Sequence, residues 1–384
     1  MGERSAHELR KLIEKFRATA VSTNPVELAK AIRASGMRGS APELAALIAL
    51  TSSQAAINYV PLVLLELVSQ ILENQKARTI CDPWAGFGAL IAAIQDAKRP
   101  EHALGFTSNV PDADVGKIIV ETVQWKVGDV LELLSEVNLE FDVIASVLPF
   151  GLRSQRPLHA MTASGEEIEL KDEQGRLILV AASQKLAADG VGLFVVTPSF
   201  FFSDASVLRH FDALGLGIEA ALALPSGTFA PYTNIETYLI IVRRRRFARM
   251  FVAEVSTDSN TNKQIVENLK LGKEGGALEL GRYVDSGSFF GFDLLRMVER
   301  LKRARDRFGF PATSLEELAI SINLGRPGEK FEFPKQENAI FIPLVGHSDV
   351  VDSVEGLALK AQNYAQVVID PSRSNARFVA RFLK

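Results

Sequence analysis

The residues best suited to chemistry in this sequence form a glycine-containing turn, Asp82-Pro83-Trp84-Ala85-Gly86-Phe87-Gly88. An apolar run precedes the turn, and the helical stretch ALIAAIQDA follows it. Glycines allow a sharp backbone turn and close approach to a ligand, and the start of a helix offers unpaired N–H groups. The pattern therefore predicts a cofactor-binding loop between a strand and a helix, of a kind common to many dinucleotide-binding proteins.

The elements that must position this turn are short apolar runs separated by helical stretches. The runs occupy residues 77–82, 102–106, 141–148, 191–198, 218–225 and 237–244. Apolar strands that alternate with helices predict a parallel sheet covered on both faces. The loop between the last two runs is too short for a crossover helix, so we expect the final strand to be antiparallel. The predicted fold class is α/β, with a Rossmann-like sheet.

The pattern divides the chain into four regions. Residues 1–75 are predicted to be helical, with Thr23-Asn24-Pro25 as one helix start. Residues 76–250 form the Rossmann-like domain, and residues 251–310 form a linker and a basic helix. Residues 311–384 begin a partial α+β domain, and the apolar ending FVARFLK, without a cap or polar tail, predicts a fragment of a longer protein.

Composition excludes several classes of protein. The 384 residues are 47% hydrophobic with a net charge of −3, as in ordinary globular proteins. The single cysteine, Cys81, cannot form an internal disulfide, and five scattered histidines provide no metal site. No uninterrupted apolar stretch reaches the roughly 18 to 20 residues of a membrane helix, and the N-terminus is charged. We therefore expect a cytoplasmic protein with no membrane segment and no metal.

The sequence Asp-Pro-x-x-Gly-x-Gly is similar to the first cofactor motif of the amino-methylating DNA methyltransferases. The resemblance covers roughly residues 55–245, and includes the stretch 175–203 and the Leu-Pro-Ser-Gly-Thr-Phe loop at 224–229. In these features the chain resembles the modification subunits of type I restriction-modification systems, which methylate adenine at N6. The resemblance implies a methyltransferase sheet and S-adenosylmethionine as cofactor.

The resemblance also assigns the residues of the cofactor site. They are Asp82, Pro83, Ala85, Gly86 and Gly88 of the turn, Tyr59 and Pro61 of a partial Tyr-Thr-Pro motif near the methionine end, and Asp129 near the adenine amine. Thr107 occupies the position where the family has an acid that binds the ribose hydroxyls. We therefore expect S-adenosylmethionine binding to be weak or lost.

The segment Val147-Leu148-Pro149-Phe150 lies where the family has Asn/Asp/Ser-Pro-Pro-Tyr/Phe. In that motif the polar residue accepts a hydrogen bond from the amine of a flipped adenine, and the aromatic ring stacks on the base. Valine cannot accept a hydrogen bond. Ser146 is the nearest polar residue, but along an extended segment its side chain points to the opposite face. The resemblance therefore implies a degenerate catalytic motif.

Two basic segments could contact DNA, although each could also be a solvated surface. The first is Arg243, Arg244, Arg245 and Arg246, followed by Arg249, and the second is Lys302, Arg303, Arg305 and Arg307. Phe229 and Tyr232 could stack on an extruded base, or could pack their own loop. The segment from Ser314 onward resembles the start of a target-recognition domain of type I specificity subunits. The implied partners are double-stranded DNA and specificity or restriction subunits.

Three hypotheses remain open at this point. One is an active adenine-specific DNA methyltransferase, which the motif order favours. Another is a DNA-binding or scaffolding subunit of a defence or modification complex without methyl transfer, which Val147, Leu148 and Thr107 favour. The third is an unrelated Rossmann enzyme, such as a small-molecule methyltransferase or a dehydrogenase, but it leaves the loop at 224–229 unexplained.

Overall fold

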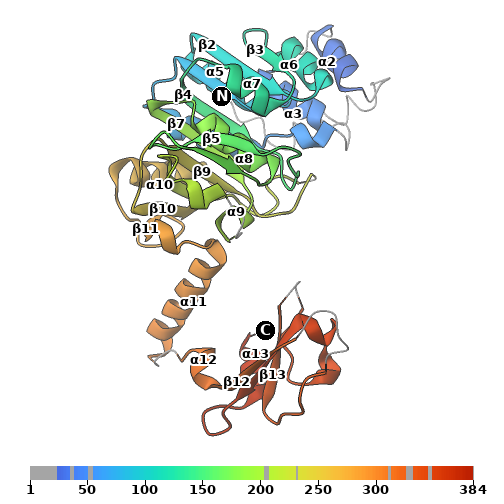
Figure 1. Cartoon of the computed structure of the whole chain (residues 1–384), viewed down its shortest axis with the longest axis vertical. Helices are drawn as coiled ribbons and strands as arrows, with labels where there is room; N and C mark the ends of the chain where they lie inside the picture. Colours follow the sequence, from blue (N-terminus) through green and yellow to red (C-terminus); the bar gives the residue numbers. More distant parts are fainter. Residues whose placement is uncertain are drawn as a thin grey trace. The chain divides into compact units, whose positions relative to one another are not determined.

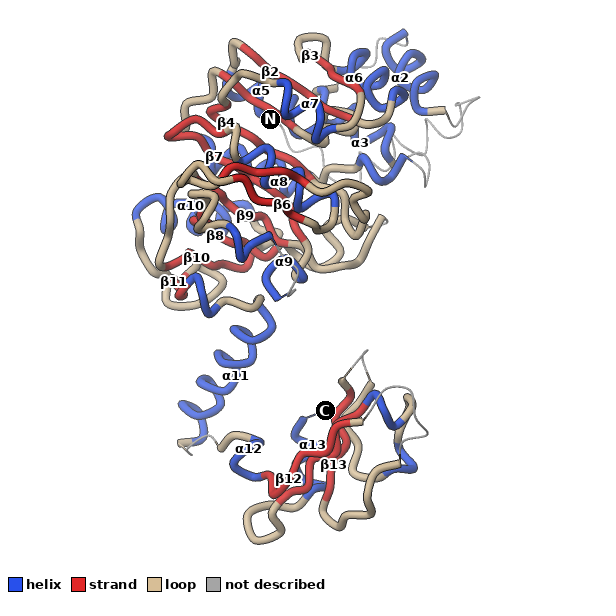
Figure 2. Tube along the Cα trace, in the orientation of Figure 1, coloured by secondary structure: helices blue, strands red, loops and turns tan. Residues whose placement is uncertain are grey.

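The computed structural model of the chain describes residues 24–34, 39–50, 55–202, 207–230, 232–309, 313–325, 332–344 and 348–383. The chain divides into two compact units, Met1–Phe292 and Asp293–Lys384 (Figure 1). The first unit is built on a large sheet and the second on a small three-stranded sheet (Figure 2). The motifs with predicted cofactor and base chemistry all lie in the first unit.

Nine strands form the large sheet, in the order β11-β10-β8-β9-β7-β4-β1-β2-β3. They are β1 (Thr79–Asp82), β2 (His102–Thr107), β3 (Gln124–Val127), β4 (Phe141–Val147), β7 (Leu186–Val196), β8 (Gly217–Ala223), β9 (Tyr238–Arg243), β10 (Arg249–Glu254) and β11 (Arg282–Asp285). Strands β1, β2, β3, β4 and β7 are parallel neighbours, and β9 is antiparallel to both β7 and β8. The predicted mostly parallel sheet and its antiparallel final apolar strand are confirmed.

Helices cover both faces of this sheet (Figure 1). The chain adds strands toward one edge of the sheet, from β1 to β3, and then toward the other, from β4 to β7. Right-handed crossovers place the connecting helices of these two halves on opposite faces. Helices α5 and α6 connect β1, β2 and β3, whereas α7 and α8 lie on the way back to β4 and β7. The helices are α2 (Pro25–Ala34), α3 (Ala41–Ala49), α4 (Leu62–Leu72), α5 (Ala89–Lys98), α6 (Val110–Ile119), α7 (Val130–Glu136), α8 (Gln174–Ser183), α9 (Ser199–Phe202) and α10 (Ser259–Leu271). The central strands are therefore buried, and Val143 and Phe194 are fully inaccessible.

The predicted helical N-terminal region contains α2, α3 and α4 in its described part. The Asn24 side chain accepts a hydrogen bond from the Val26 N–H (2.9 Å) at the start of α2, whereas residues 1–23 lie outside the described residues. The segment Ala55–Leu72 has the length and hydropathy of a membrane span. Half of it is buried inside the protein, where Leu64 and Leu67 are inaccessible, as in a core helix.

The sheet continues beyond residue 250, where the sequence had indicated a linker. Strand β10 pairs in parallel with β8, and β11 pairs antiparallel with β10. The apolar run of β10 is short and is followed by the polar helix α10, so the sequence pattern is typical of a polar linker. Tertiary pairing with β8 buries Phe251 and Val252 completely and makes this segment part of the sheet.

The second unit begins with helix α11 (Phe292–Phe308), the predicted basic helix. A short helix α12 (Leu315–Leu318) leads into β12 (Ala319–Leu324), which pairs antiparallel with β14 (Tyr364–Ile369). Strand β13 (Ala339–Pro343) pairs with the other edge of β14, and α13 (Ala376–Leu383) packs on this sheet. The strands predicted at 338–344 and 365–370 and the helix predicted after residue 377 are present.

Candidate active site

The glycine turn lies between β1 and α5, at the carboxyl ends of the parallel strands. Gly86 and Gly88 have φ angles of 51° and 85°, a left-handed conformation that favours glycine. The Ala85 N–H donates to the carbonyl of Phe106 in β2 (2.9 Å), and Gly88 is the N-cap of α5. The turn is thereby held between two strands and the start of a helix, a geometry suited to a bound cofactor.

Asp82, the first residue of the turn, points into the protein. Its Oδ1 accepts hydrogen bonds from the Ser146 hydroxyl (2.7 Å) and the Trp84 N–H (3.0 Å), and its side chain is buried. Burial raises the pKa of Asp82 from 3.8 to about 7, against the opposing effect of these hydrogen bonds. Ser146 is fully buried and faces Asp82, so its hydroxyl does not replace the missing acceptor at Val147.

The raised pKa of Asp82 predicts an unusual pH dependence of stability. The folded state holds a proton that the unfolded chain releases above about pH 4, so the free energy of unfolding should fall as the pH rises from about 4 to 7. We expect Asp82→Asn, which cannot ionise, to flatten this part of the profile. Urea denaturation at several pH values measures it, and parallel profiles for the two proteins would contradict the prediction.

A polar pair that the sequence did not single out lies beside the glycine turn. A Cβ atom on Gly86 would lie 2.6 Å from the Asn58 Oδ1, so the Asn58 side chain packs directly on the turn. The Asn58 amide donates to Asp112 in the first turn of α6 (3.2 Å), and burial raises the pKa of Asp112 to about 6. The neighbouring Tyr59 is half-buried and Pro61 is the N-cap of α4. No spacing rule connects residues 58 and 112, so only the fold reveals this pair.

The ends of β2 and β3 position Thr107 and Asp129. The Thr107 hydroxyl accepts a hydrogen bond from the Asn109 N–H (3.1 Å) and is buried. The Asp129 Oδ1 accepts from the Leu131 and Glu132 N–H groups (2.9 and 3.3 Å) and caps α7. The Thr107 side chain therefore stabilises the loop between β2 and α6. The Asp129 side chain caps α7, in addition to the adenine contact that the resemblance implies.

The segment Val147–Phe150 follows β4, and its inner side is closely packed. Leu148 is 4% exposed, and it lines a cavity of about 20 Å³ with Pro149, Phe150 and residues of β7 and α8. A Cβ atom on Gly175 would lie 2.5 Å from the Pro149 carbonyl oxygen, so α8 packs tightly on this segment. The cavity has room for about one water molecule, and Val147 is not among the residues that line it.

The Leu-Pro-Ser-Gly-Thr-Phe loop between β8 and β9 contacts this segment across the end of β7, which lies between β9 and β4 in the sheet. Phe229 packs edge-on against Phe150, with ring centroids 6.0 Å apart, and is 2% exposed. Tyr232 is 38% exposed. Of the two aromatic residues predicted to stack on a base, Phe229 is buried against Phe150, and Tyr232 is exposed.

A buried ion pair lies behind the Val147–Phe150 segment and was not anticipated from the sequence. Arg176 of α8 donates to Asp172 (3.1 Å) and to the Ser199 hydroxyl (2.7 Å), and the side chains of Arg176 and Asp172 are 7% and 3% exposed. Asp172 also accepts from the Val207 N–H (2.8 Å). This network fixes the start of α8 against the end of β7.

The four arginines predicted to contact DNA lie at the opposite edge of the sheet. Strand β9 is antiparallel to β7, so its last residue lies beside the amino end of β7, away from the glycine turn. Each arginine has an acidic partner: Arg243 and Arg245 contact Glu219, Arg244 contacts Glu140 and Arg246 contacts Asp212. The fold does not bring these arginines to the other predicted site residues.

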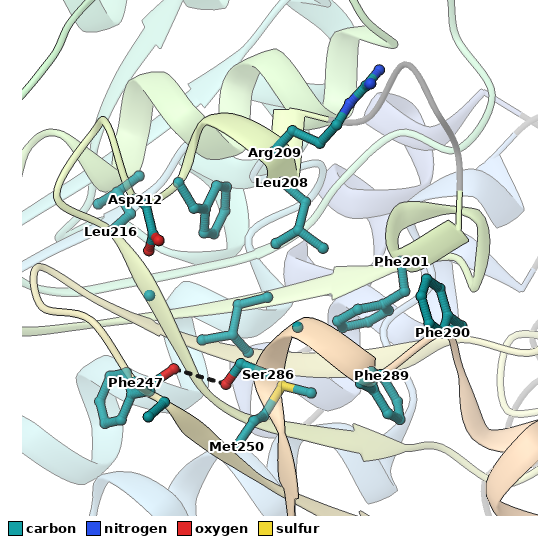
Figure 3. Close-up of a pocket in the computed structure, with 15 residues that line it drawn as sticks. Phe201, Leu208, Arg209, Asp212, Leu216, Phe247, Met250, Ser286, Phe289 and Phe290 are labelled. Atoms are coloured by element: carbon teal, nitrogen blue, oxygen red, sulfur yellow. Dashed lines mark hydrogen bonds between the residues drawn. The ribbon is translucent and has the colours of Figure 1, made fainter.

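A larger cavity of about 480 Å³ opens near the amino ends of β8 and β10 (Figure 3). Phe201, Phe289 and Met250 project into it, and the Ser286 hydroxyl donates to the Phe247 carbonyl oxygen (2.8 Å). None of the residues predicted for the cofactor or the base lines this cavity.

Comparison with known proteins places this geometry in context. No protein-family model and no curated protein matches the sequence. The type I restriction-modification methyltransferase subunit from Streptococcus thermophilus superimposes with a TM-score of 0.51 at 14% identity, covering 69% of this chain and 64% of that one. A chain from a type I system solved to explain complex assembly has a TM-score of 0.49 at 15% identity, covering 70% of each chain.

A class I S-adenosylmethionine-dependent methyltransferase from Listeria monocytogenes gives a TM-score of 0.47 at 13% identity, covering 69% of this chain and 97% of that one. At such identities similarity shows the fold alone, and this chain spans less than two thirds of the Streptococcus subunit. The chain therefore has a mostly parallel α/β fold that is similar to the fold of the type I restriction-modification methyltransferase subunit from Streptococcus thermophilus.

Proposed function

We propose that this chain is a DNA-binding protein of a restriction-modification or related defence system, with impaired or absent transfer of a methyl group to adenine N6. The observation that supports this most directly is the apolar Val147–Leu148 pair at the end of β4, beside an intact glycine turn. The Val147 side chain offers no hydrogen-bond acceptor, and Leu148 is buried. These features support a methyltransferase framework that lacks the side-chain acceptor for the adenine amine.

The proposed cofactor is S-adenosylmethionine, bound weakly. The turn at Gly86 and Gly88 supports binding, whereas Thr107 lacks the two acceptor oxygens that a carboxylate would offer to the ribose hydroxyls. The proposed partners are duplex DNA and specificity or restriction subunits, in the cytoplasm. Calorimetry with the purified chain tests the cofactor, and a submicromolar dissociation constant would contradict weak binding.

An active adenine-specific methyltransferase is the second candidate. The order of the motifs along the sheet favours it, because the glycine turn, Asp129 and Phe150 all follow the carboxyl ends of parallel strands, β1, β3 and β4. A small-molecule methyltransferase is a weaker alternative, because it does not explain the loop at 224–229. Methyl incorporation into DNA distinguishes the first two, as argued in the Discussion.

We expect the purified chain to bind mixed-sequence duplex weakly, with a dissociation constant of about 10⁻⁶ to 10⁻⁴ M and a steep dependence on salt. Lys302 and Arg305 are exposed on α11 and can contact phosphates. Replacing both with alanine should weaken binding and reduce the slope of log K against log salt by about 2. Fluorescence anisotropy of a labelled duplex at several salt concentrations measures both quantities.

The matched control replaces Arg245 and Arg246, which were predicted from the sequence to contact DNA, with serine. Both contact carboxylates at the other edge of the sheet from the glycine turn, so we expect affinity within about twofold of the unmodified chain. A large loss of DNA affinity in this control would show that the arginines after β9 contact the DNA. If DNA binding by the unmodified chain and by both variants did not depend on salt, the contact would not be with the phosphates.

A further inference from the structure

A carboxylate that the sequence motifs do not include is hydrogen-bonded to Asn58, the side chain that packs on the glycine turn. Asn58 packs on Gly86, with its Oδ1 2.6 Å from the position of a Cβ atom, and its amide donates to the Asp112 Oδ1 at 3.2 Å. Asn58 belongs to the 3₁₀ turn before α4, and Asp112 belongs to the first turn of α6. Two segments 54 residues apart in the chain thus place a carboxylate next to the turn.

The first turn of a helix favours an acidic residue such as Asp112, but the Asp112 side chain is not the cap of α6. Asn109 is the N-cap of α6, and the described partner of Asp112 is the neutral amide of Asn58. Charged neighbours on the same helix pair elsewhere, as Lys117 does with Asp114 (3.3 Å). Asp112 is partly buried, and burial raises its pKa to about 6. Burial therefore disfavours the charged form of Asp112, and hydroxyl groups of a ligand that donate to this carboxylate would offset the lost solvation.

The position of the acid normally found after the second strand is taken by Thr107, whose hydroxyl is occupied by the Asn109 N–H. Asp112 follows five residues later, on the helix that β2 leads into. A carboxylate has two oxygens and can accept hydrogen bonds from both hydroxyls of a ribose, which a threonine hydroxyl cannot. Asp112 is therefore the acidic group available on the α6 side of the glycine turn.

We propose that Asp112, oriented by Asn58, accepts hydrogen bonds from the ribose hydroxyls of an adenosine-containing cofactor bound on the glycine turn, in place of the acid absent at Thr107. The inference rests on the proposed function, because it assumes a nucleoside cofactor at this turn. It assigns cofactor recognition to two residues outside the motifs. The weak binding expected above would then depend on this pair.

The test is calorimetric titration of S-adenosylhomocysteine into the full chain. We expect Asp112→Asn, which keeps the size of the side chain but removes the charge, to weaken binding at least tenfold. Asp114→Asn on the same helix, where the lost partner is Lys117, should bind within twofold of the unmodified chain. Asn58→Ala should weaken binding by a smaller factor, because the acid remains but its orientation is lost.

A second measurement compares two nucleosides on the unmodified chain, so its first result does not depend on the folding of a variant. The unmodified chain should bind adenosine at least fivefold more tightly than 2′,3′-dideoxyadenosine, and Asp112→Asn should lose this preference. Equal affinity of Asp112→Asn and the unmodified chain, equal binding of the two nucleosides, or no binding by the unmodified chain would each overturn the inference. Failure of the proposed function is seen separately, as absence of DNA binding in the anisotropy experiment.

Discussion

The unmodified protein is expected to transfer no detectable tritiated methyl group to adenine in mixed-sequence duplex, even when its natural partner subunits are present. Transfer requires the amine lone pair to point at the methyl group, and a side-chain acceptor at residue 147 would normally help to orient it. Val147 has no side-chain acceptor, and the Ser146 hydroxyl is fully buried, where it donates to Asp82. An unpaired amine alone destabilises the bound base by about 1–3 kcal/mol. Loss of orientation adds to this.

The control for this experiment is an active adenine methyltransferase in the same assay. Val147→Asn with Leu148→Pro restores an acceptor and a rigid turn, but we expect little recovery, because α8 still packs against Pro149 and Phe229 still packs against Phe150. If the unmodified protein incorporated tritiated methyl groups at adenine, the proposed loss of catalysis would be refuted, and the chain would be an active methyltransferase.

Replacing Arg176 with methionine is expected to lower the free energy of unfolding of the first unit by about 3–5 kcal/mol. Arg176 and Asp172 form an ion pair whose side chains are 7% and 3% exposed, so loss of the arginine leaves a buried carboxylate without its cation. The Ser199 hydroxyl would lose the hydrogen bond from Arg176 and keep the one with Thr197. Urea denaturation followed by tryptophan fluorescence measures this change, because both tryptophans, Trp84 and Trp125, lie in the first unit.

The matched control is Arg156→Met, which removes an ion pair with Glu132 whose side chains are 68% and 60% exposed. Solvent screens such a pair, so we expect a change below about 1 kcal/mol. Similar losses in the two variants would show that burial does not strengthen the Arg176 pair. An unchanged stability in Arg176→Met would mean that the start of α8 is fixed by apolar packing alone.

Local composition was sufficient to predict most of the elements of the first unit. The six apolar runs all form strands, because a strand buried on both faces needs apolar residues at every position, a pattern visible without the fold. The short loop before residues 237–244 was enough to predict the antiparallel β9. Strand β10 was missed because its apolar run is short and its burial depends on pairing with β8.

The sequence by itself was enough to predict the glycine turn and the lack of a side-chain acceptor at Val147, since the conformational freedom of Gly86 and the absence of an acceptor on valine are properties of single residues. The tertiary structure alone decided which residues meet. The pairs Asp82 with Ser146 and Asn58 with Asp112 are 64 and 54 positions apart, and strand order and crossover direction bring them together. The same geometry placed Arg243–Arg246 at the opposite edge of the sheet, because an antiparallel strand ends where its parallel neighbours begin.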